Sequence, residues 1–151
     1  MSNFKLSGRS LERLVGVDMF LSSVMKTAID MTEIDFGVGE GVRSKERQIS
    51  LVAAGKSQTL NSKHLEGKAV DLLAYEGGWL SWEHADFDKI ADAVRQAAIQ
   101  HEVPIRWGGA WTVSDIRQWE GSMHDARMSY IDTRKAENRV PFVDSPHFEV
   151  A

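Results

Sequence analysis

The sequence contains no cysteine, which limits the metal and redox chemistry that the protein can carry. Without thiols there are no disulfides, no thiolate zinc ligands of the zinc-finger type and no cysteine nucleophile. Any transition metal must therefore be held by histidine, aspartate or glutamate. The core of the 151 residues has to form by apolar packing, helped at most by a bound metal ion.

Long apolar segments are also absent. No apolar run reaches 18 residues, and residues 1–20 lack an apolar stretch behind a basic start. Neither a transmembrane helix nor a signal peptide is therefore predicted. We expect a protein that is made in the cytoplasm, does not insert stably into membranes and needs another factor to leave the cell.

A basic excess is missing as well, since 18 Lys and Arg stand against 22 Asp and Glu, a formal net charge of -4. Proteins that coat nucleic acid usually have a basic footprint, so no nucleic-acid partner is expected. The chain also has no repeat, low-complexity tract or proline-rich linker. These absences predict one continuous domain over residues 1–151.

Hydrophobic periodicity predicts alternating helices and short strands. Helices are expected at residues 21–29 behind an Asp18 cap, at 45–54 behind a Ser44 cap, at 87–98 and at about 123–138. Strands are expected at 33–40, 69–75, 79–82, 103–109 and 146–150. The sum is an α+β domain in which helices cover one face of a small antiparallel sheet.

One candidate site begins in the segment "NSKHLEGKAVDLLAY", residues 61–75. Asp71 lies in an apolar strand pattern, where a carboxylate is tolerated mainly when a cation or hydrogen bonds compensate it. Gly67 lets the chain reverse after His64, so the imidazole and the carboxylate can meet. Two ligands are too few for a hydrolytic zinc, which needs three protein ligands and an open position. Taken alone, the pair is equally typical of a turn that leads into a strand.

His147 is the candidate third ligand. His84 and His101 lie at the two ends of a predicted helix, where capping or solvent-facing roles are expected. His147 stands at the entry to the last strand, with Asp144 three positions earlier and Pro146 fixing the backbone between them. Asp144 could then lie near a metal without binding it and accept a proton from water. By spacing alone, a surface histidine and a capping aspartate remain open alternatives.

Three ordered segments resemble a known family. "SKHLEGKAVDL" (62–72) is similar to the S-x-H-x-x-G-x-A-x-D signature of the D-Ala-D-Ala carboxypeptidase and L-alanyl-D-glutamate endopeptidase superfamily. "EGVRSKERQ" (40–48) and the "WGGAW" and "VDSPHFEV" segments within 107–150 match its other blocks in the same order. The resemblance covers nearly the whole chain and is closest to the compact endolysins of phages that infect Gram-negative bacteria. It implies the hedgehog/DD-peptidase fold.

The resemblance also implies a mechanism. His64, Asp71 and His147 align with the zinc (Zn2+) ligands and Asp144 with the general base. The implied substrate is the peptidoglycan stem peptide, cut between L-Ala and D-Glu. Two alternatives are D-Ala-D-Ala carboxypeptidase or dipeptidase activity and a binding protein that keeps the zinc fold without catalysis. A metal-free α+β domain is a third.

Further residues are implied to bind substrate. Arg43 aligns with an arginine that contacts the substrate carbonyl and its developing charge, although a lone loop arginine is also typical of a surface salt bridge. Ser62 supports the His64 loop or touches substrate, or is only a turn residue. Most of the five tryptophans should be core or sheet-covering residues. Trp107 and Trp111 are the two that we expect to line the cleft.

The family also suggests how the protein works in a phage infection. An endolysin of this type waits in the host cytoplasm until a holin opens the route to the cell wall. We expect a monomer without a separate cell-wall-binding domain.

The sequence departs from the family pattern in two places. Ala110 stands where members often have Asp, so a role for that carboxylate is in doubt. The stretch 112–143 is longer than in the smallest members and contains a predicted helix with several cations. These cations are Arg127, Arg134, Lys135 and Arg139. We expect them mainly to face solvent, and the alternative is that they contact the anionic cell wall. Gln48 is likewise expected at a solvated helix position.

Overall fold

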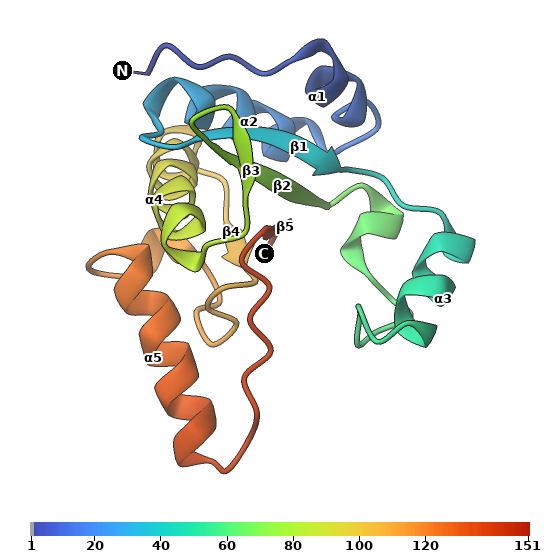
Figure 1. The fold of residues 1–151 in the computed structure, drawn as a ribbon, viewed down its shortest axis with the longest axis vertical. Coiled ribbons are helices and arrows are strands. Elements are labelled where there is room, and N and C mark those ends of the chain that lie inside the picture. Colours follow the sequence, from blue (N-terminus) through green and yellow to red (C-terminus); the bar gives the residue numbers. More distant parts are fainter. Residues whose placement is uncertain (1) are drawn as a thin grey trace.

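The computed structural model describes residues 2–151 and confirms the expected α+β architecture (Figure 1). The helices are α1 (Gly8–Arg13), α2 (Met19–Met31), α3 (Lys45–Ala53), α4 (His84–His101) and α5 (Met123–Ala136), with short 3-10 turns η1 (Lys63–Glu66) and η2 (Ile116–Gln118). The strands are β1 (Asp35–Glu40), β2 (Ala69–Glu76), β3 (Trp79–Ser81), β4 (Ile105–Trp107) and β5 (His147–Val150). None of the helices within residues 2–151 combines the length and apolarity needed to cross a bilayer.

All strand pairs are antiparallel, in the order β1-β2-β5-β4, with β3 paired to β2 beside this path. Residues directly opposite each other in an antiparallel pair share one face of the sheet. The register pairs Glu40 with Asp71, Asp71 with His147, and Arg106 with Glu149. One face of the sheet therefore carries a continuous row of polar and ionisable side chains.

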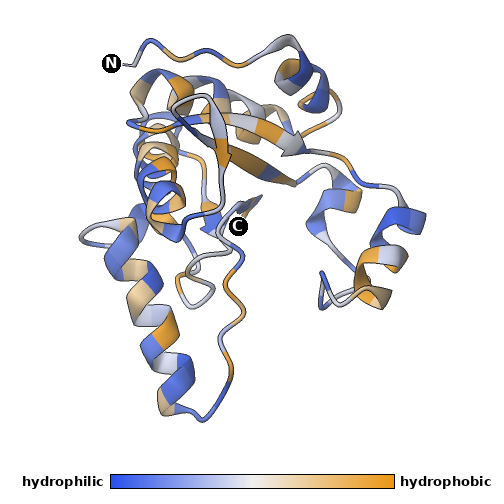
Figure 2. Cartoon of the chain, in the orientation of Figure 1, coloured by the Kyte–Doolittle hydropathy of each residue, from blue (hydrophilic) through white to orange (hydrophobic). Residues whose placement is uncertain are grey.

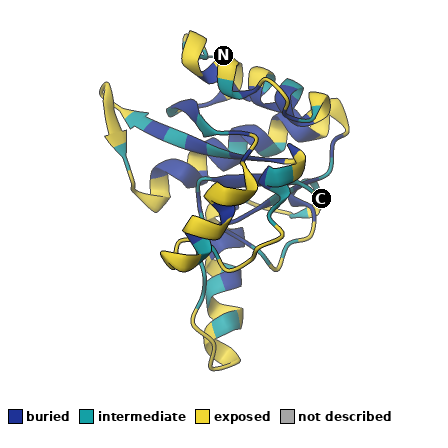
Figure 3. Ribbon diagram, turned by 90° about the vertical axis from the view of Figure 1, so that its right-hand side faces the viewer, coloured by how far each residue is buried: buried dark blue, intermediate teal, exposed yellow. Residues whose placement is uncertain are grey.

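The other face of the sheet is apolar and belongs to the core. Helices α2 and α4 pack against each other on this side, and their apolar residues enclose one cluster with the inward side chains of the strands. Val70, Leu72 and Phe148 alternate with the polar row and are buried. Figure 2 shows the apolar residues on β1 and β2, and Figure 3 shows the buried layer between the helices and the sheet.

A β-bulge near the end of β1 decides which face Glu40 takes. The register shifts between Val38, which pairs with Leu72, and Glu40, which pairs with Asp71. In a regular strand Glu40 would share the buried face with Val38, because the side-chain period is two. The extra residue moves the Glu40 carboxylate to the polar row instead.

The helix caps follow the predictions made from sequence. Asp18 Oδ1 accepts hydrogen bonds from the backbone N–H groups of Phe20 and Leu21, and Ser44 accepts one from Arg47. These bonds satisfy donors that have no partner inside the helix. Helix α1 was not predicted, because its six residues are too few to show a helical period.

Three of the five tryptophans lie in or against the core as expected, Trp107, Trp111 and Trp119, but the other two do not. Trp79 and Trp82 have exposed fractions of 80% and 67%. They lie on and just after β3, which forms the outer strand of the hairpin beyond the helix-covered part of the sheet (Figure 1). The apolar-looking "WLSW" segment therefore contributes little to the core.

Helix α5 and the segment that follows it form an arm that extends away from the sheet (Figure 1). The prediction that Arg127 faces solvent is wrong. Its guanidinium donates from Nε and Nη2 to the two carboxylate oxygens of Asp88 on α4, at 2.8 and 2.9 Å. His124 Nδ1 lies 3.1 Å from the same carboxylate. The buried Arg127–Asp88 ion pair attaches the arm to α4.

Replacing Arg127 with alanine should lower the free energy of unfolding by about 3 kcal/mol, because the buried Asp88 carboxylate loses its charged partner. Lys89→Ala, which breaks an exposed ion pair with Glu33, should cost less than about 1 kcal/mol. Equilibrium urea unfolding measures both. Equal losses would show that the α4–α5 ion pair contributes no more than the exposed one.

Candidate functional site

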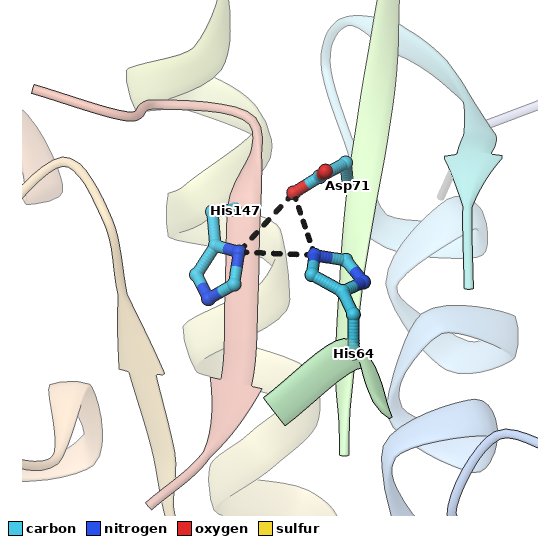
Figure 4. A group of neighbouring side chains, drawn as sticks. All are labelled: His64, Asp71 and His147. Carbon is cyan, nitrogen blue, oxygen red and sulfur yellow. Dashed lines mark hydrogen bonds and ion pairs between the residues drawn. The ribbon is translucent and has the colours of Figure 1, made fainter. Parts of the chain in front are cut away.

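The structure brings together the three residues predicted as metal ligands. His64 comes from η1, Asp71 from β2 and His147 from β5 (Figure 4). Asp71 Oδ1 lies 3.2 Å from His64 Nε2 and 3.2 Å from His147 Nδ1. The two imidazole nitrogens are 3.3 Å apart. Three candidate ligand atoms from η1, β2 and β5 thus form a nearly equilateral triangle.

Local structure explains how His64 reaches this triangle. Ser62 caps η1 by accepting a hydrogen bond from the His64 N–H at 3.2 Å. Gly67 ends the turn with a φ of 71°, and a Cβ at this position would lie 2.5 Å from the Gly16 carbonyl oxygen. Only glycine fits both the left-handed backbone and the close approach. Ser62 therefore supports the turn that carries His64, which was one of the roles expected for it.

Each histidine has an outer partner that selects which nitrogen faces the triangle. His64 Nδ1 lies 2.8 Å from the Gly41 carbonyl oxygen, which can only accept, so Nδ1 carries the proton and Nε2 presents a lone pair. His147 Nε2 lies 2.8 Å from Glu149 Oε1. When His147 is neutral, this bond keeps the proton on Nε2 and turns the Nδ1 lone pair inward.

The triangle fits a divalent metal ion. Three acceptor atoms at such short separations repel one another unless a cation or a proton lies among them. Zinc–nitrogen bonds of 2.0–2.1 Å in a tetrahedron separate neighbouring ligand atoms by about 3.3 Å. Two imidazoles and one carboxylate, without thiolate, also suit first-row transition metals. His64, Asp71 and His147 could hold such an ion and leave a position for water or substrate.

The pKa values of Asp71 and His147 depend on the contacts between these residues. Burial alone would raise the pKa of Asp71, but hydrogen bonds from His147 and His64 outweigh it and hold that pKa well below its usual range. Burial alone would lower the pKa of His147, but the bonds to Asp71 and Glu149 outweigh it and raise the pKa to about 9. Without a metal, a proton on His147 therefore supplies the positive charge.

Arg43 holds the second oxygen of the ligand carboxylate. Its Nη2 donates to Asp71 Oδ2 at 3.1 Å, its Nε to Glu40 Oε1 at 2.5 Å and its Nη1 to Gln48 Oε1 at 2.6 Å. Arg43 is buried, so the alternative of a solvated surface salt bridge is wrong. Gln48, expected to be solvated, is fully buried and also donates to the Thr59 carbonyl.

Asp144 lies in the same cavity as the triangle. Burial, and then the negative charge of Asp71, raises the pKa of its carboxyl. Its backbone N–H donates to the Gly108 carbonyl at 2.9 Å, and the His147 N–H donates to the Asp144 carbonyl at 3.1 Å. A Cβ on Gly108 would lie 2.3 Å from the Asp144 carbonyl oxygen, so glycine is required there.

The two tryptophans expected in the cleft have different positions. Trp111 lines the cavity, and its ring centre lies 5.4 Å from that of His147. Trp107 is fully buried, so its expected place in the cleft wall is wrong. Its indole stacks on Phe148 and donates to the Ser145 carbonyl at 2.7 Å. Trp107 therefore supports the segment that carries Asp144 from behind.

Glu149 is a site residue that the sequence analysis missed. It follows His147 by two positions on β5 and so shares its face of the sheet. Besides contacting His147 Nε2, it lies 3.5 Å from Lys63 Nζ. Burial would raise the pKa of Glu149, but the His147 hydrogen bond and the positive charges of His147 and Lys63 together outweigh burial and lower this pKa. The two-residue spacing of His147 and Glu149 could have indicated this role, but the apolar neighbours in "PHFEV" favoured reading the segment only as a strand.

Ala110, where family members often have Asp, is fully buried. A carboxylate at this position would need a buried partner.

A cavity of about 760 Å³ opens over the triangle. Residues of α3 and the loop after it line one side, and residues of α5 and its returning segment line the other. Figure 1 shows these two parts on opposite sides of the end of β5. The volume suits a ligand larger than a single amino acid.

Comparisons with known proteins agree with this geometry. The model of the family described as phage L-alanyl-D-glutamate peptidase matches residues 1–151. The chain is 28% identical over 127 residues to the L-alanyl-D-glutamate peptidase of Escherichia phage T5, covering 82% of this chain and 88% of that protein. It is 34% identical over 79 residues to the L-alanyl-D-glutamate peptidase of Listeria phage A118, covering 52% of this chain and 27% of that protein.

A solved structure is similar over almost the entire fold. The Serratia marcescens L-Ala D-Glu endopeptidase ChiX matches with a TM-score of 0.71 and 35% sequence identity. The match covers 95% of this chain and 87% of that chain.

Metal affinity should depend on pH, because a metal ion has to displace the proton on His147. The folded-state pKa of this histidine is raised to about 9, so affinity for Co²⁺ should fall about tenfold per pH unit as pH decreases from 9 to 6. Competition against a chelating dye at several pH values measures this slope. His101→Gln, at the far end of α4, should keep it, and a flat profile in the wild-type protein would contradict the expectation.

The Glu149–His147 contact should also contribute to metal affinity. Glu149→Gln removes the charge that orients and polarises the imidazole, and should weaken Co²⁺ binding about 10- to 100-fold. Glu137→Gln, an exposed position at the end of α5, is the matched control. Equal affinities of the two variants would exclude a role for Glu149 in the metal site.

Proposed function

This chain belongs to the phage L-alanyl-D-glutamate peptidase family and is a peptidoglycan endopeptidase, and we propose that it uses zinc to hydrolyse the L-Ala–D-Glu bond of the stem peptide. The proposed zinc ligands are His64, Asp71 and His147. The relatives from Escherichia phage T5 and Listeria phage A118 carry this activity in their names, as does the ChiX endopeptidase.

One observation carries the proposal. The ligand triangle and a free carboxylate, that of Asp144, line the same cavity. Among residues 2–151, no side chain or backbone donor binds the Asp144 carboxylate, whereas Asp71 and Glu149 are both engaged. A purely structural metal would not need a spare base beside it. The geometry therefore favours catalysis over a non-catalytic binding protein.

The chain's own residues then divide the chemistry. When bound, zinc supplies Lewis acidity that polarises the scissile carbonyl and acidifies water. Asp144 accepts a proton from the attacking water while the water oxygen bonds to the L-Ala carbonyl carbon. It then gives that proton to the D-Glu nitrogen as the C–N bond breaks. The raised pKa of Asp144 makes it a stronger base than an exposed aspartate.

Arg43, Ser62 and Trp111 complete the proposed substrate site. Arg43 uses three of its five N–H groups on Asp71, Glu40 and Gln48. We assign the remaining ones to the negative charge that develops on the carbonyl oxygen. Ser62 and Trp111 both line the cavity, where Trp111 can pack against the peptide.

The phage relatives support a role in lysis. In this proposal the protein acts as a single-domain monomer whose partner is peptidoglycan, and it stays in the host cytoplasm until a holin lets it reach the cell wall. A lysis assay in cells with and without a co-expressed holin tests this route.

The scissile bond can be tested on purified peptidoglycan. Mass spectrometry of the digest should show stem peptides with a new D-Glu amino terminus and L-Ala carboxylates on the glycan side. A chelator should stop the reaction and added zinc should restore it. Release of terminal D-Ala with intact L-Ala–D-Glu bonds would instead support the carboxypeptidase alternative.

Replacing Asp144 with asparagine should lower kcat about 10²- to 10⁴-fold, because the amide cannot accept the proton from water. The variant should still bind Co²⁺, since Asp144 is not one of the three proposed ligands. Asp132→Asn, at an exposed position of α5, provides the control. Wild-type activity in Asp144→Asn would remove the proposed base.

A further inference from the structure

The cavity has a charge opposite to that of the rest of the chain. Seven of the 18 Lys and Arg residues line it, against four of the 22 Asp and Glu residues. The remaining chain therefore holds 11 basic and 18 acidic residues. A cavity with excess positive charge in an acidic protein attracts anionic ligands.

Most of these cations are already paired with a carboxylate. Arg43 contacts Glu40 and Asp71, Lys63 contacts Glu149, and the arginines of the arm contact Glu137. Among the cavity cations of residues 2–151, no carboxylate lies within ion-pair distance of Arg47, Lys56 or Arg106. These three are the candidates for contacts with an anionic ligand.

Of these three residues, Arg106 has its charged group held in place by neighbouring atoms. Its Nε donates to the Trp111 carbonyl at 3.1 Å, and its Nη2 donates to the same oxygen. The guanidinium also lies over the Trp111 ring, 5.2 Å from the ring centre. Arg47 and Lys56 are exposed and have no such support. An ordered guanidinium loses less entropy when it binds a carboxylate.

Arg106 also lies close to the reaction centre. It pairs with Glu149 in the β4–β5 register and so shares the polar face of the sheet with His147. The Trp111 ring that supports it lies 5.4 Å from the His147 ring. Glu149 does not form an ion pair with Arg106, because its oxygens contact His147 Nε2 and Lys63 Nζ.

We infer that Arg106 binds the side-group carboxylate of the D-glutamyl residue on the leaving side of the scissile bond. The inference rests on the proposed function and adds a specificity-determining residue to it. A glutamyl residue has two carboxyl groups, and a chain that continues through one of them leaves the other free. The Arg106 Nη1 and the unused N–H of Nη2 form a fork that matches a carboxylate.

Two synthetic stem peptides test this inference. They are identical except that the glutamyl carboxylate is free in one and a carboxamide in the other. The wild-type enzyme should cleave the acid with a kcat/KM about 10- to 100-fold above that of the amide. In Arg106→Gln the two peptides should be cleaved with about equal kcat/KM, because only the value for the acid falls. Arg106→Lys should show an intermediate ratio, because lysine keeps the positive charge but not the two parallel N–H donors.

Arg9→Gln is the matched control, because it removes the same charge from the exposed surface of α1, and it should keep the wild-type preference. The ratio of the two substrates does not depend on the folded fraction of a variant, so a loss of stability cannot imitate the result. In a third peptide the glutamyl carboxylate is free and a carboxylate of the next residue is amidated instead. Arg106→Gln should not change, relative to wild type, the ratio between the kcat/KM for this peptide and the kcat/KM for the peptide in which both carboxylates are free.

Other outcomes would overturn the inference. If wild-type enzyme cleaves acid and amide equally, if Arg106→Gln keeps the preference, or if only the third peptide is affected, Arg106 does not read the glutamyl carboxylate. The proposed function would survive each of these results. Failure of the wild-type enzyme to cut the L-Ala–D-Glu bond in any peptide would overturn both.

Discussion

The structure depends on three acceptor atoms being held against their mutual repulsion. His64 Nε2, His147 Nδ1 and Asp71 Oδ1 come from three segments, and His147 is 76 residues away from Asp71 in the chain. The β2–β5 register places Asp71 opposite His147, and the capped turn before β2 brings in His64. A positive charge at the centre converts this repulsion into attraction. The same requirement explains why a proton is held there so tightly when no metal is present.

The outer partners of the three ligands come from different kinds of structure, yet each has the same effect. A backbone carbonyl fixes His64, a carboxylate fixes His147, and a guanidinium fixes Asp71. Each contact leaves one atom free to point inward. The two-faced sheet makes this possible, because its apolar side can anchor the strands in the core while its other side carries the polar row. The bulge in β1 extends that polar side by one more carboxylate.

Much of the fold could be predicted because its signals are local. Periodicity located α2, α4 and the strands, and the caps Asp18 and Ser44 were visible in the sequence. The three residues proposed as metal ligands were visible through spacing and family motifs. Trp107 and Arg127 were misjudged because their burial depends on partners 38 and 39 residues away in the chain. Gln48 was misjudged because its partners, Arg43 and Thr59, lie in irregular segments on either side of α3. An apolar or polar character alone does not reveal whether a distant carbonyl or carboxylate will meet the side chain.

The position of β5 in the sheet has a consequence for synthesis. This strand lies between β2 and β4, although it is the last of the five along the chain, and His147 contacts Asp71 across a separation of 76 residues. A ribosome that has not yet translated residues 147–150 has made neither the middle of the sheet nor the third ligand. Unfinished chains consequently lack the complete reaction centre, and the ability to cut peptidoglycan requires that residues 147–150 have been added and have paired with β2.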